Sequence, residues 1–325
     1  MPTVSAYKSQ QAGVQADLKQ MWKSVVPAFQ EQQKLLIKFL PESTIRTTTY
    51  AFKDAVPFPS LWTYGSARTQ STFQDRSVSM GIVPYQLSIP FSHYDDLDDQ
   101  LGDLREHVQM GVQRYAQLPD VLISEYFNAV PNLNPSLLKA YDGSDLFSNL
   151  DGDGQNRLGV LGGNIISGSG LTVAGVVSDI AKAQRRFLDM VDPTARKPIY
   201  RAEDVAFTKL HVIGPNTANE VLQKAAKSEN IRIDPANTVS ESNYIMGTFS
   251  WHLSPYLTDP ADLYVVVDHP FWKPFIFRGP GTIESIMADS SNSDRARETN
   301  EYCFYTSMRC RLGVMMPACI IKINN

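Results

Sequence analysis

The sequence is poor in the residues that usually carry metal or redox chemistry. Among 325 residues there are only three cysteines, Cys303, Cys310 and Cys319, and no two form a Cys-x-x-Cys pair. If Cys303 and Cys310 share one extended strand, they lie too far apart for a disulfide. Five histidines are scattered without zinc-ligand spacing: His93, His107, His211, His252 and His269. We expect no metal site and no cofactor.

Long apolar runs are also missing. The longest, such as Leu35 to Ile37 and Leu171 to Val177, fall far short of the ~20 residues needed to cross a bilayer. The first residues, MPTVSAYKSQQAG, lack the charged start and apolar stretch of a secretory signal. We expect no long removable domain before the N-terminal segment. The sequence therefore predicts a folded protein of the cytoplasm without a membrane partner.

Charge of one sign does not dominate the chain. The formal net charge is −4, which is too close to neutral for the whole chain to attract nucleic acid strongly. Locally, residues 1 to 40 carry five lysines against Asp17 and Glu31, whereas residues 93 to 130 carry eight acids against Arg105 and Arg114. These two segments have opposite charge and are suited to attract each other across subunits.

An active site is not evident either. The run NLDGDGQNRLGV places Asn149, Asp151 and Asp153 as in a calcium loop, but Val160 stands where the bidentate glutamate belongs, so a solvated loop is favoured. The acids of HYDDLDDQLGD suit a solvated helix start better than acid–base catalysis. The glycines of GGNIISGSG fit no phosphate-binding pattern. We therefore expect a protein that is not an enzyme.

The N-terminal part of the sequence predicts an arm followed by a long loop. Apolar residues recur at helical spacing between Ser9 and Leu40, which favours a helical arm or an ordinary packed first helix. From Ser43 to Pro90 the alternation in STIRTTTYAF and MGIVPYQLSI predicts two strands that flank a long excursion. The excursion carries aromatic residues on a polar, Pro-rich background, which favours a protein interface, the alternative being burial within its own subunit.

The strongest periodic signal predicts a long helix over about residues 93 to 130. Apolar residues such as Leu97, Leu104, Val108 and Leu118 recur there every three or four positions. Pro119 is expected to kink or divide it.

Residues 131 to 170 are rich in Gly, Asn, Asp and Ser and should form loops. A second helix should be capped by Thr172, and a third should begin with a capping box of Thr217 and Glu220. The later segments FTKLHVIG, IMGTFSWHL, LYVVVDH, PFIFRG and ACIIKI read as strands, with Met308, Cys310, Leu312 and Val314 alternating against Arg309 and Arg311. The class is α+β.

The order of several motifs resembles the Mu-like major head subunits of tailed phages. The motifs are LWTYGSAR with Trp62, Gly65 and Arg68, IPFSHYDDLDDQLG, LPDVLISEYF, AYDGSDLFS, DLYVVVDH with KPFIFR, and EYCFYTSMRCRLGVMM. They span most of residues 40 to 316. The resemblance implies the Hong-Kong-97-type capsid fold, with an N-terminal arm, an extended loop, a peripheral domain containing a long spine helix, and an axial domain.

The resemblance also implies provisional boundaries. Residues 1–42 correspond to the arm, 43–130 to the extended loop and the peripheral domain with the spine helix, and 131–260 to the axial domain. Residues 261–325 supply strands shared between the two domains. Within the second segment, 55 to 85 correspond to the loop itself and 93 to 130 to the spine helix.

The function implied is that of a major capsid protein, which self-assembles as hexamers and pentamers into an icosahedral shell around phage DNA. Its place is the virion capsid, assembled in the host cytoplasm. Double-stranded DNA on the inner face and scaffold, portal and cement proteins are the other partners. Candidate contacts between subunits are Phe58, Leu61, Trp62, Arg68, Arg76, Asp98 and Asp99.

Two alternatives remain at this point: the shell protein of a cellular cargo compartment, and a soluble enzyme with a dispersed site. Some relatives join their subunits by an isopeptide bond from a loop lysine. This sequence has no lysine between Lys53 and Lys139, so a non-covalent shell is expected.

Overall fold

The computed structural model describes residue 20 and residues 33–40, 47–53, 75–92, 101–192, 197–232, 240–279, 284–288, 293–299 and 301–325. The chain divides into two compact units made of discontinuous segments. The first unit includes Gly81–Leu122 and Phe277–Leu312, and the second includes Thr49–Met80, Ile123–Ile276 and Gly313–Asn325.

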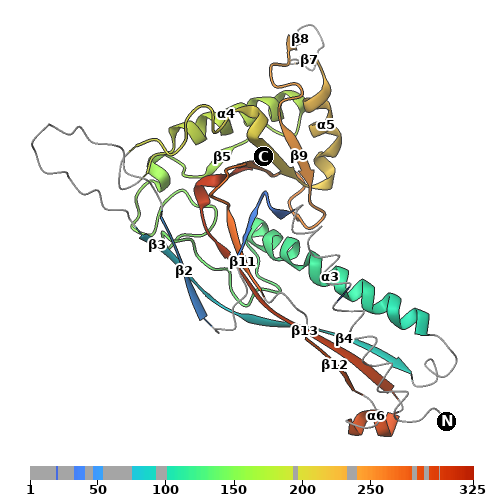
Figure 1. Ribbon diagram of the computed structural model, residues 1–325. Helices are drawn as coiled ribbons and strands as arrows, with labels where there is room; N and C mark the ends of the chain where they lie inside the picture. The colour runs from blue at the N-terminus through green and yellow to red at the C-terminus, as the bar shows by residue number, and fades with distance from the viewer. Residues whose placement is uncertain are drawn as a thin grey trace, which may run out of the picture. The chain divides into compact units, whose positions relative to one another are not determined.

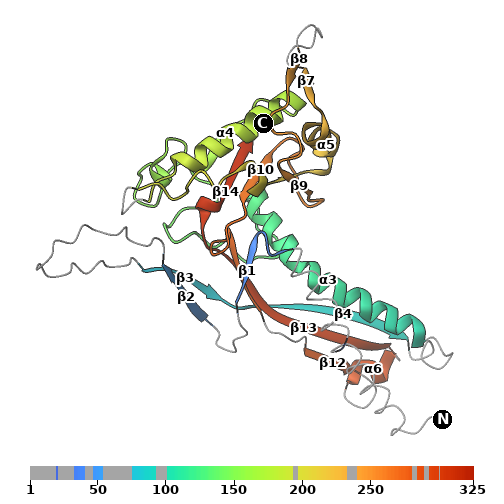
Figure 2. The same cartoon turned by 45° about the horizontal axis from the view of Figure 1, so that its top comes forward.

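The first unit is built on the predicted long helix, α3 (Leu101–Asn128), which belongs to this unit as far as Leu122. The predicted apolar stripe is confirmed, because Val112, Tyr115 and Leu118 are buried. Both ribbon views show α3 lying along β4 (Val83–Ser92) and β13 (Glu301–Val314) (Figure 1, Figure 2). A methyl group added at Gly111 would come within 3.0 Å of the Leu87 side chain, so this glycine allows the close approach.

A sheet with most of its residues in this unit has the strand order β1 (Ile37–Phe39), β11 (Phe275–Arg278), β13 and β12 (Glu284–Ala288), with β4 also paired to β13. The first two residues of β11 belong to the second unit. Side chains alternate along β13, so that Thr306 and Met308 are buried while Tyr305 is exposed. The Tyr115 hydroxyl donates a hydrogen bond of 2.9 Å to the Thr306 carbonyl oxygen, and burial raises the Tyr115 pKa. A short helix, α6 (Asp294–Thr299), precedes β13.

Three expectations for these segments change. Pro119 lies inside a single continuous α3 and does not divide it, because the buried side chains on either side hold both turns against the sheet. Most of the helical segment expected from Ser9 to Leu40 lies outside the described residues, and its last part forms strand β1 and not helix. Arg311, expected on the polar side of its strand, is 3% exposed. Cys303 and Cys310 do share one strand and are free thiols, as the spacing argument requires.

The second unit contains a mixed sheet in the order β5 (Ile165–Ser167), β14 (Ile320–Asn324), β10 (Leu263–Val267), β6 (Leu210–Gly214) and β9 (Ser250–Leu253). The central strand β10 pairs antiparallel with β14 and β6, and all of its residues are buried. Its apolar run LYVVV fits a strand covered on both faces. A small pair of strands, β7 (Asn230–Arg232) and β8 (Ser240–Ser242), lies apart from this sheet.

Two helices pack with this sheet, α4 (Val173–Asp189) and α5 (Asn219–Lys227) (Figure 2). The predicted cap of α4 is confirmed, because the Thr172 hydroxyl accepts a hydrogen bond of 3.1 Å from the Gly175 amide. The capping box predicted for α5 is wrong. A 3-10 turn already begins at Asn216, so Thr217 lies inside it and its hydroxyl donates to the Pro260 carbonyl.

We expect Thr172→Ala to lower the free energy of unfolding by about 1 kcal/mol, because the first turn of α4 loses its side-chain acceptor. Urea unfolding followed by circular dichroism measures this change. Ser178, exposed on the same helix, is the control, and Ser178→Ala should change stability by no more than about 0.5 kcal/mol. Equal losses in the two variants would contradict the capping role.

The core of the second unit is aromatic. The rings of Phe127 and Tyr264 stack with centroids 4.4 Å apart, and Phe147 and Phe275 lie against them. The Tyr264 hydroxyl donates to the Phe127 carbonyl at 3.1 Å, so this buried polar group is satisfied.

None of the described helices is long and apolar enough to span a bilayer.

Candidate assembly site

Most of the residues predicted to contact a neighbouring subunit lie outside the described residues. They are Phe58, Leu61, Trp62, Arg68, Asp98 and Asp99. Arg76 is described, as are both strands that flank the loop. The described part of the candidate assembly site consists of the base of the loop and the side chains that contact this base.

The base of the loop is formed by strands β2 (Thr47–Lys53) and β3 (Asp75–Gly81), which pair in a two-stranded sheet. The first strand predicted beside the excursion is confirmed by β2. The second, predicted from MGIVPYQLSI, corresponds to β4, which pairs with β13, whereas β3 lies mostly in residues predicted to be loop. Along β3, Val78 and Met80 are buried while Ser77 and Ser79 are exposed, the alternation expected for a strand with one covered face. A side chain at Gly313 would clash with the Met80 sulfur, so Met80 packs closely against the chain at Gly313.

Arg76 on β3 is held from one side by an aromatic ring. Its guanidinium carbon lies 4.9 Å from the centroid of the Tyr141 ring, within the range of a cation–π interaction. Tyr141 belongs to the Gly- and Asp-rich segment that follows α3. Arg76 thus connects the loop base to residues 140 to 164 of the second unit.

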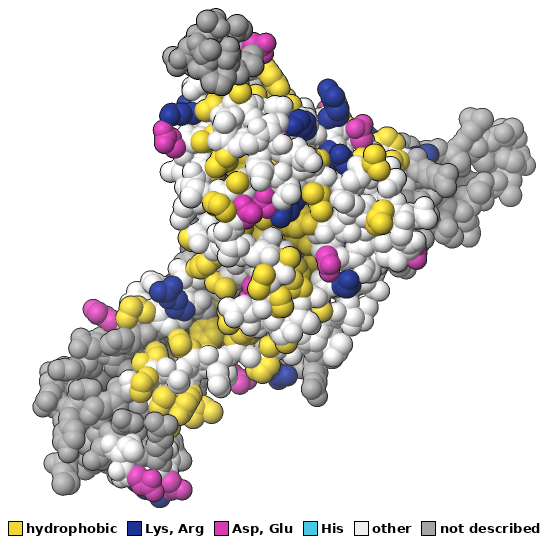
Figure 3. Space-filling view, turned by 180° about the vertical axis from the view of Figure 1, so that it is seen from behind, with side chains coloured by type: hydrophobic (Ala, Val, Ile, Leu, Met, Phe, Trp, Pro, Cys, Tyr) yellow, Lys and Arg dark blue, Asp and Glu magenta, His cyan; other side chains and the backbone are white. Residues whose placement is uncertain are grey.

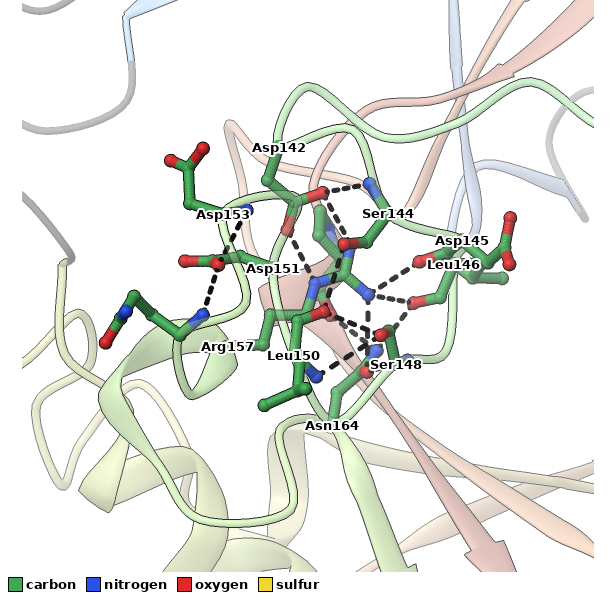
Figure 4. Close-up of polar contacts among 12 residues, drawn as sticks. Asp142, Ser144, Asp145, Leu146, Ser148, Leu150, Asp151, Asp153, Arg157 and Asn164 are labelled. Atoms are coloured by element: carbon green, nitrogen blue, oxygen red, sulfur yellow. Dashed lines mark hydrogen bonds and ion pairs between the residues drawn. The ribbon is translucent and has the colours of Figure 1, made fainter.

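The segment next to Tyr141 is organised by a buried arginine, Arg157 (Figure 4). Its side chain is fully buried, and two of its nitrogens contact the Asp142 carboxylate, Nε at 2.7 Å and the other at 3.0 Å. The remaining terminal nitrogen donates to the carbonyl oxygens of Asp145 at 2.6 Å and Leu146 at 2.8 Å. A two-point contact of this kind gives both energy and a fixed geometry.

Asn164 joins this cluster to the sheet. Its amide nitrogen donates to the Leu146 carbonyl at 2.8 Å and to the Ile320 carbonyl at 3.3 Å, and its amide oxygen accepts from the Ser148 backbone at 3.1 Å (Figure 4). Asn164 is fully buried. The contacts run from Arg76 through Tyr141, Asp142 and Arg157 into residues next to β14. These contacts therefore connect the loop base to the buried residues around β14 in the second unit.

The Asp- and Gly-rich residues of this segment have conformational roles. Asp151 accepts hydrogen bonds from the backbone amides of Asp153 at 3.1 Å and Gln155 at 2.8 Å, which is an Asx-type turn. A methyl group at Gly152 would lie 2.4 Å from the Asp142 carbonyl oxygen. The residues that resembled half of a calcium loop thus shape a turn. Among the described residues, no group of three or more His, Cys, Asp or Glu side chains is arranged to hold a metal ion.

Two features of the second unit are not predictable from the sequence. The burial of Arg157 could not be predicted, because no pattern in the neighbouring residues indicates that an arginine inside a polar loop is buried. Two of the scattered histidines form a pair: His211 Nδ1 and His252 Nε2 lie 3.2 Å apart although the residues are 41 positions apart in the sequence. The only available signal was the alternation in FTKLHVIG and IMGTFSWHL, which is too weak to align the two strands.

The comparisons with known proteins rest on structure alone, because the sequence matches no protein-family model and no curated protein. A chain of the procapsid of bacteriophage JBD30 matches with a TM-score of 0.51 at 14% identity, covering 100% of this chain and 76% of the other. For the mature capsid of bacteriophage PhiM1 the TM-score is 0.51 at 9% identity, with 90% and 86% covered. The capsid of an empty GTA particle matches with a TM-score of 0.53 at 11% identity, with 90% and 89% covered.

The chain has the Hong-Kong-97-type capsid fold. This confirms the fold predicted from the order of the motifs. The division of the capsid fold into arm, extended loop, peripheral domain and axial domain at the boundaries given above stays a prediction. The same holds for the contact residues, of which Arg76 has Tyr141 of its own chain as a partner.

We expect Arg76→Ala to destabilise the loop base of this capsid fold by about 0.5–1 kcal/mol, the usual size of a cation–π contact that water can reach, because both side chains are partly exposed. Hydrogen exchange of the β2 and β3 amides should become faster, while amides of β10 keep their protection. Arg76→Lys retains the charge and should lie between the wild type and Arg76→Ala. Unchanged exchange in β2 and β3 would show that the contact with Tyr141 does not hold the hairpin.

Proposed function

We propose that the chain is the major subunit of an icosahedral shell that encloses the DNA of a tailed phage. The observation that carries this proposal is the capsid fold, which extends over 100% of the chain in the match to a phage procapsid and over 90% in the match to a mature phage capsid. Folds do not by themselves determine function. Here the support is strengthened by motifs whose order independently resembles phage head subunits.

The partners follow from this role. The chain associates with copies of itself as hexamers and pentamers, and the shell encloses double-stranded DNA in the virion. Scaffold, portal and cement proteins are further partners, and assembly takes place in the host cytoplasm. The net charge of −4 is consistent with a shell subunit that does not bind the enclosed DNA strongly by electrostatic attraction. On the face in Figure 3, described side chains of both signs lie interspersed, as expected for such a surface.

The proposed contact between subunits is the extended loop laid over a neighbour. Phe58, Leu61 and Trp62 supply apolar area, and Arg68 pairs with Asp98 or Asp99. Arg76 is proposed for the same role, although its position over Tyr141 makes Arg68 the sharper test. Many weak contacts of this kind, repeated around a closed shell, give a stable particle.

Electron microscopy of the purified full chain tests the proposal. We expect closed shells of uniform diameter, formed either by the chain alone or after addition of the scaffold protein of its own genome. Only small, discrete oligomers under every assembly condition, with and without scaffold, would overturn the proposal.

A charge exchange tests the contact itself. Arg68→Asp should reduce the yield of shells, because it places two acids together, and Asp98→Arg with Asp99→Arg should restore the yield in the same chain. Circular dichroism must show the same unfolding temperature for all variants. If the combined variant did not restore assembly, the pairing of Arg68 with Asp98 or Asp99 would be rejected. The shell proposal would not be affected, because electron microscopy of the wild type tests it separately.

The shell is proposed to be non-covalent, since no lysine lies between Lys53 and Lys139. Boiled particles on a denaturing gel should run as single chains of 36.3 kDa. A ladder of linked subunits would contradict this prediction.

A further inference from the structure

Two histidines meet on one face of the second unit's sheet. His211 lies on β6 and His252 on the neighbouring parallel strand β9, where the register pairs Ile213 with His252. His211 is two residues before Ile213, so both side chains point to the same face. The His211 Nδ1 and His252 Nε2 atoms are 3.2 Å apart, and the ring planes differ by 24°.

This separation suits two nitrogen ligands of one metal ion. Imidazole nitrogens bind zinc at about 2.0–2.1 Å, and two of them on a tetrahedral ion lie about 3.3 Å apart. The 3.2 Å separation observed here is nearly the same. In the structure the two nitrogens form a hydrogen bond, so binding of one ion requires the rings to turn until both lone pairs meet it. His252 is exposed and His211 partly exposed, so the rings have room to turn and water has access.

The surroundings keep both rings available for a cation. Burial lowers the pKa of His211, with a further decrease from His252, and burial also lowers the pKa of His252. Neutral imidazole is the form that binds metal. The charged groups near His211 are Asp268 and Lys273, whose carboxylate and ammonium lie 2.7 Å apart and offset each other. A cation at the pair therefore meets little net repulsion.

We propose that His211 and His252 form a two-histidine binding site for a divalent transition-metal ion of the zinc, nickel and cobalt class. Imidazole is a preferred ligand of these metals. Within the described part of the chain no third His, Cys, Asp or Glu side chain completes the site, so water fills the remaining positions. Such a site holds its ion exchangeably and does not stabilise the fold as a closed structural zinc site would. The proposal is independent of the shell proposal.

The test uses the full chain, freed of metal with a chelator that is then removed. Isothermal titration with zinc chloride should show binding, and cobalt chloride should give a visible absorption band that reports nitrogen ligands. His211→Gln and His252→Gln should each weaken zinc binding by at least about tenfold, the range seen when a metal site loses one supporting group. Glutamine keeps a neutral polar side chain, and circular dichroism verifies the fold of each variant.

His269 supplies the matched control. Its Nδ1 already accepts hydrogen bonds from the Phe271 amide at 3.3 Å and the Trp272 amide at 3.2 Å, and its ring stacks on Trp272. His269→Gln should therefore leave zinc affinity unchanged. The proposal is overturned if the wild type binds no more zinc than the His211→Gln variant, or if His269→Gln loses affinity equally.

Discussion

Arg157→Ala is expected to lower the free energy of unfolding by about 3–5 kcal/mol, because it removes one partner of a buried charge pair. The Asp142 carboxylate would lose both of its contacts with the guanidinium. The carbonyl oxygens of Asp145 and Leu146 would lose their donor at the same time. A loss of this size is a large fraction of the stability of a typical domain.

Urea unfolding followed by tryptophan fluorescence measures this effect. Arg185, exposed on α4, is the matched control, and Arg185→Ala should change stability by no more than about 0.5 kcal/mol. Arg157→Lys is expected to recover only part of the loss, since lysine cannot make the two-point contact with Asp142. A loss below about 1 kcal/mol in Arg157→Ala would mean that the cluster does not organise the loop.

Gly163→Ala is the second variant with a large expected effect, about 2–4 kcal/mol of destabilisation. Gly163 has a φ of +55°, where a side chain is strained, and an added methyl carbon would lie 2.1 Å from the Ser148 carbonyl oxygen. The backbone at Gly163 or at Ser148 would have to move to relieve this overlap. Because Ser148 also binds Asn164, that movement would disturb the Arg157 cluster.

Gly154 allows the two causes to be separated. It has a similar positive φ of +77°, but nothing lies within 4 Å of an added methyl group. Gly154→Ala should therefore cost only the conformational strain, about 1–2 kcal/mol. If both variants lost the same stability in urea unfolding, the contact with Ser148 would be excluded as a cause.

The sequence predicted those elements whose signal is local. The helical stripe of α3 and the Thr172 cap are read directly from residue spacing, because a helix buries every third or fourth side chain. The free thiols of Cys303 and Cys310 follow from strand geometry as soon as both lie on β13. The fold was predicted in another way, from the resemblance of the order of the motifs to that in phage head subunits. Residue spacing alone does not predict it.

The wrong predictions concern residues whose role depends on distant neighbours. Thr217 and Glu220 have the spacing of a capping box, yet Thr217 bonds to Pro260 and Glu220 to Lys224. The predicted division of the helix at Pro119 does not occur, because buried residues on both sides keep α3 continuous, and a kink there stays a prediction. Arg311 follows the alternation of its strand and is nevertheless buried.

The sequence by itself determined the class, the long helix, strands β2 and β4 and the expectation of a shell subunit. Only the tertiary structure decided that Arg157 is buried beside Asp142, that Arg76 stacks on Tyr141, and that His211 and His252 share a face. The physical reason is range. Helix and strand periodicity depend on a few consecutive residues, whereas these contacts require strand register and loop closure that no local pattern encodes.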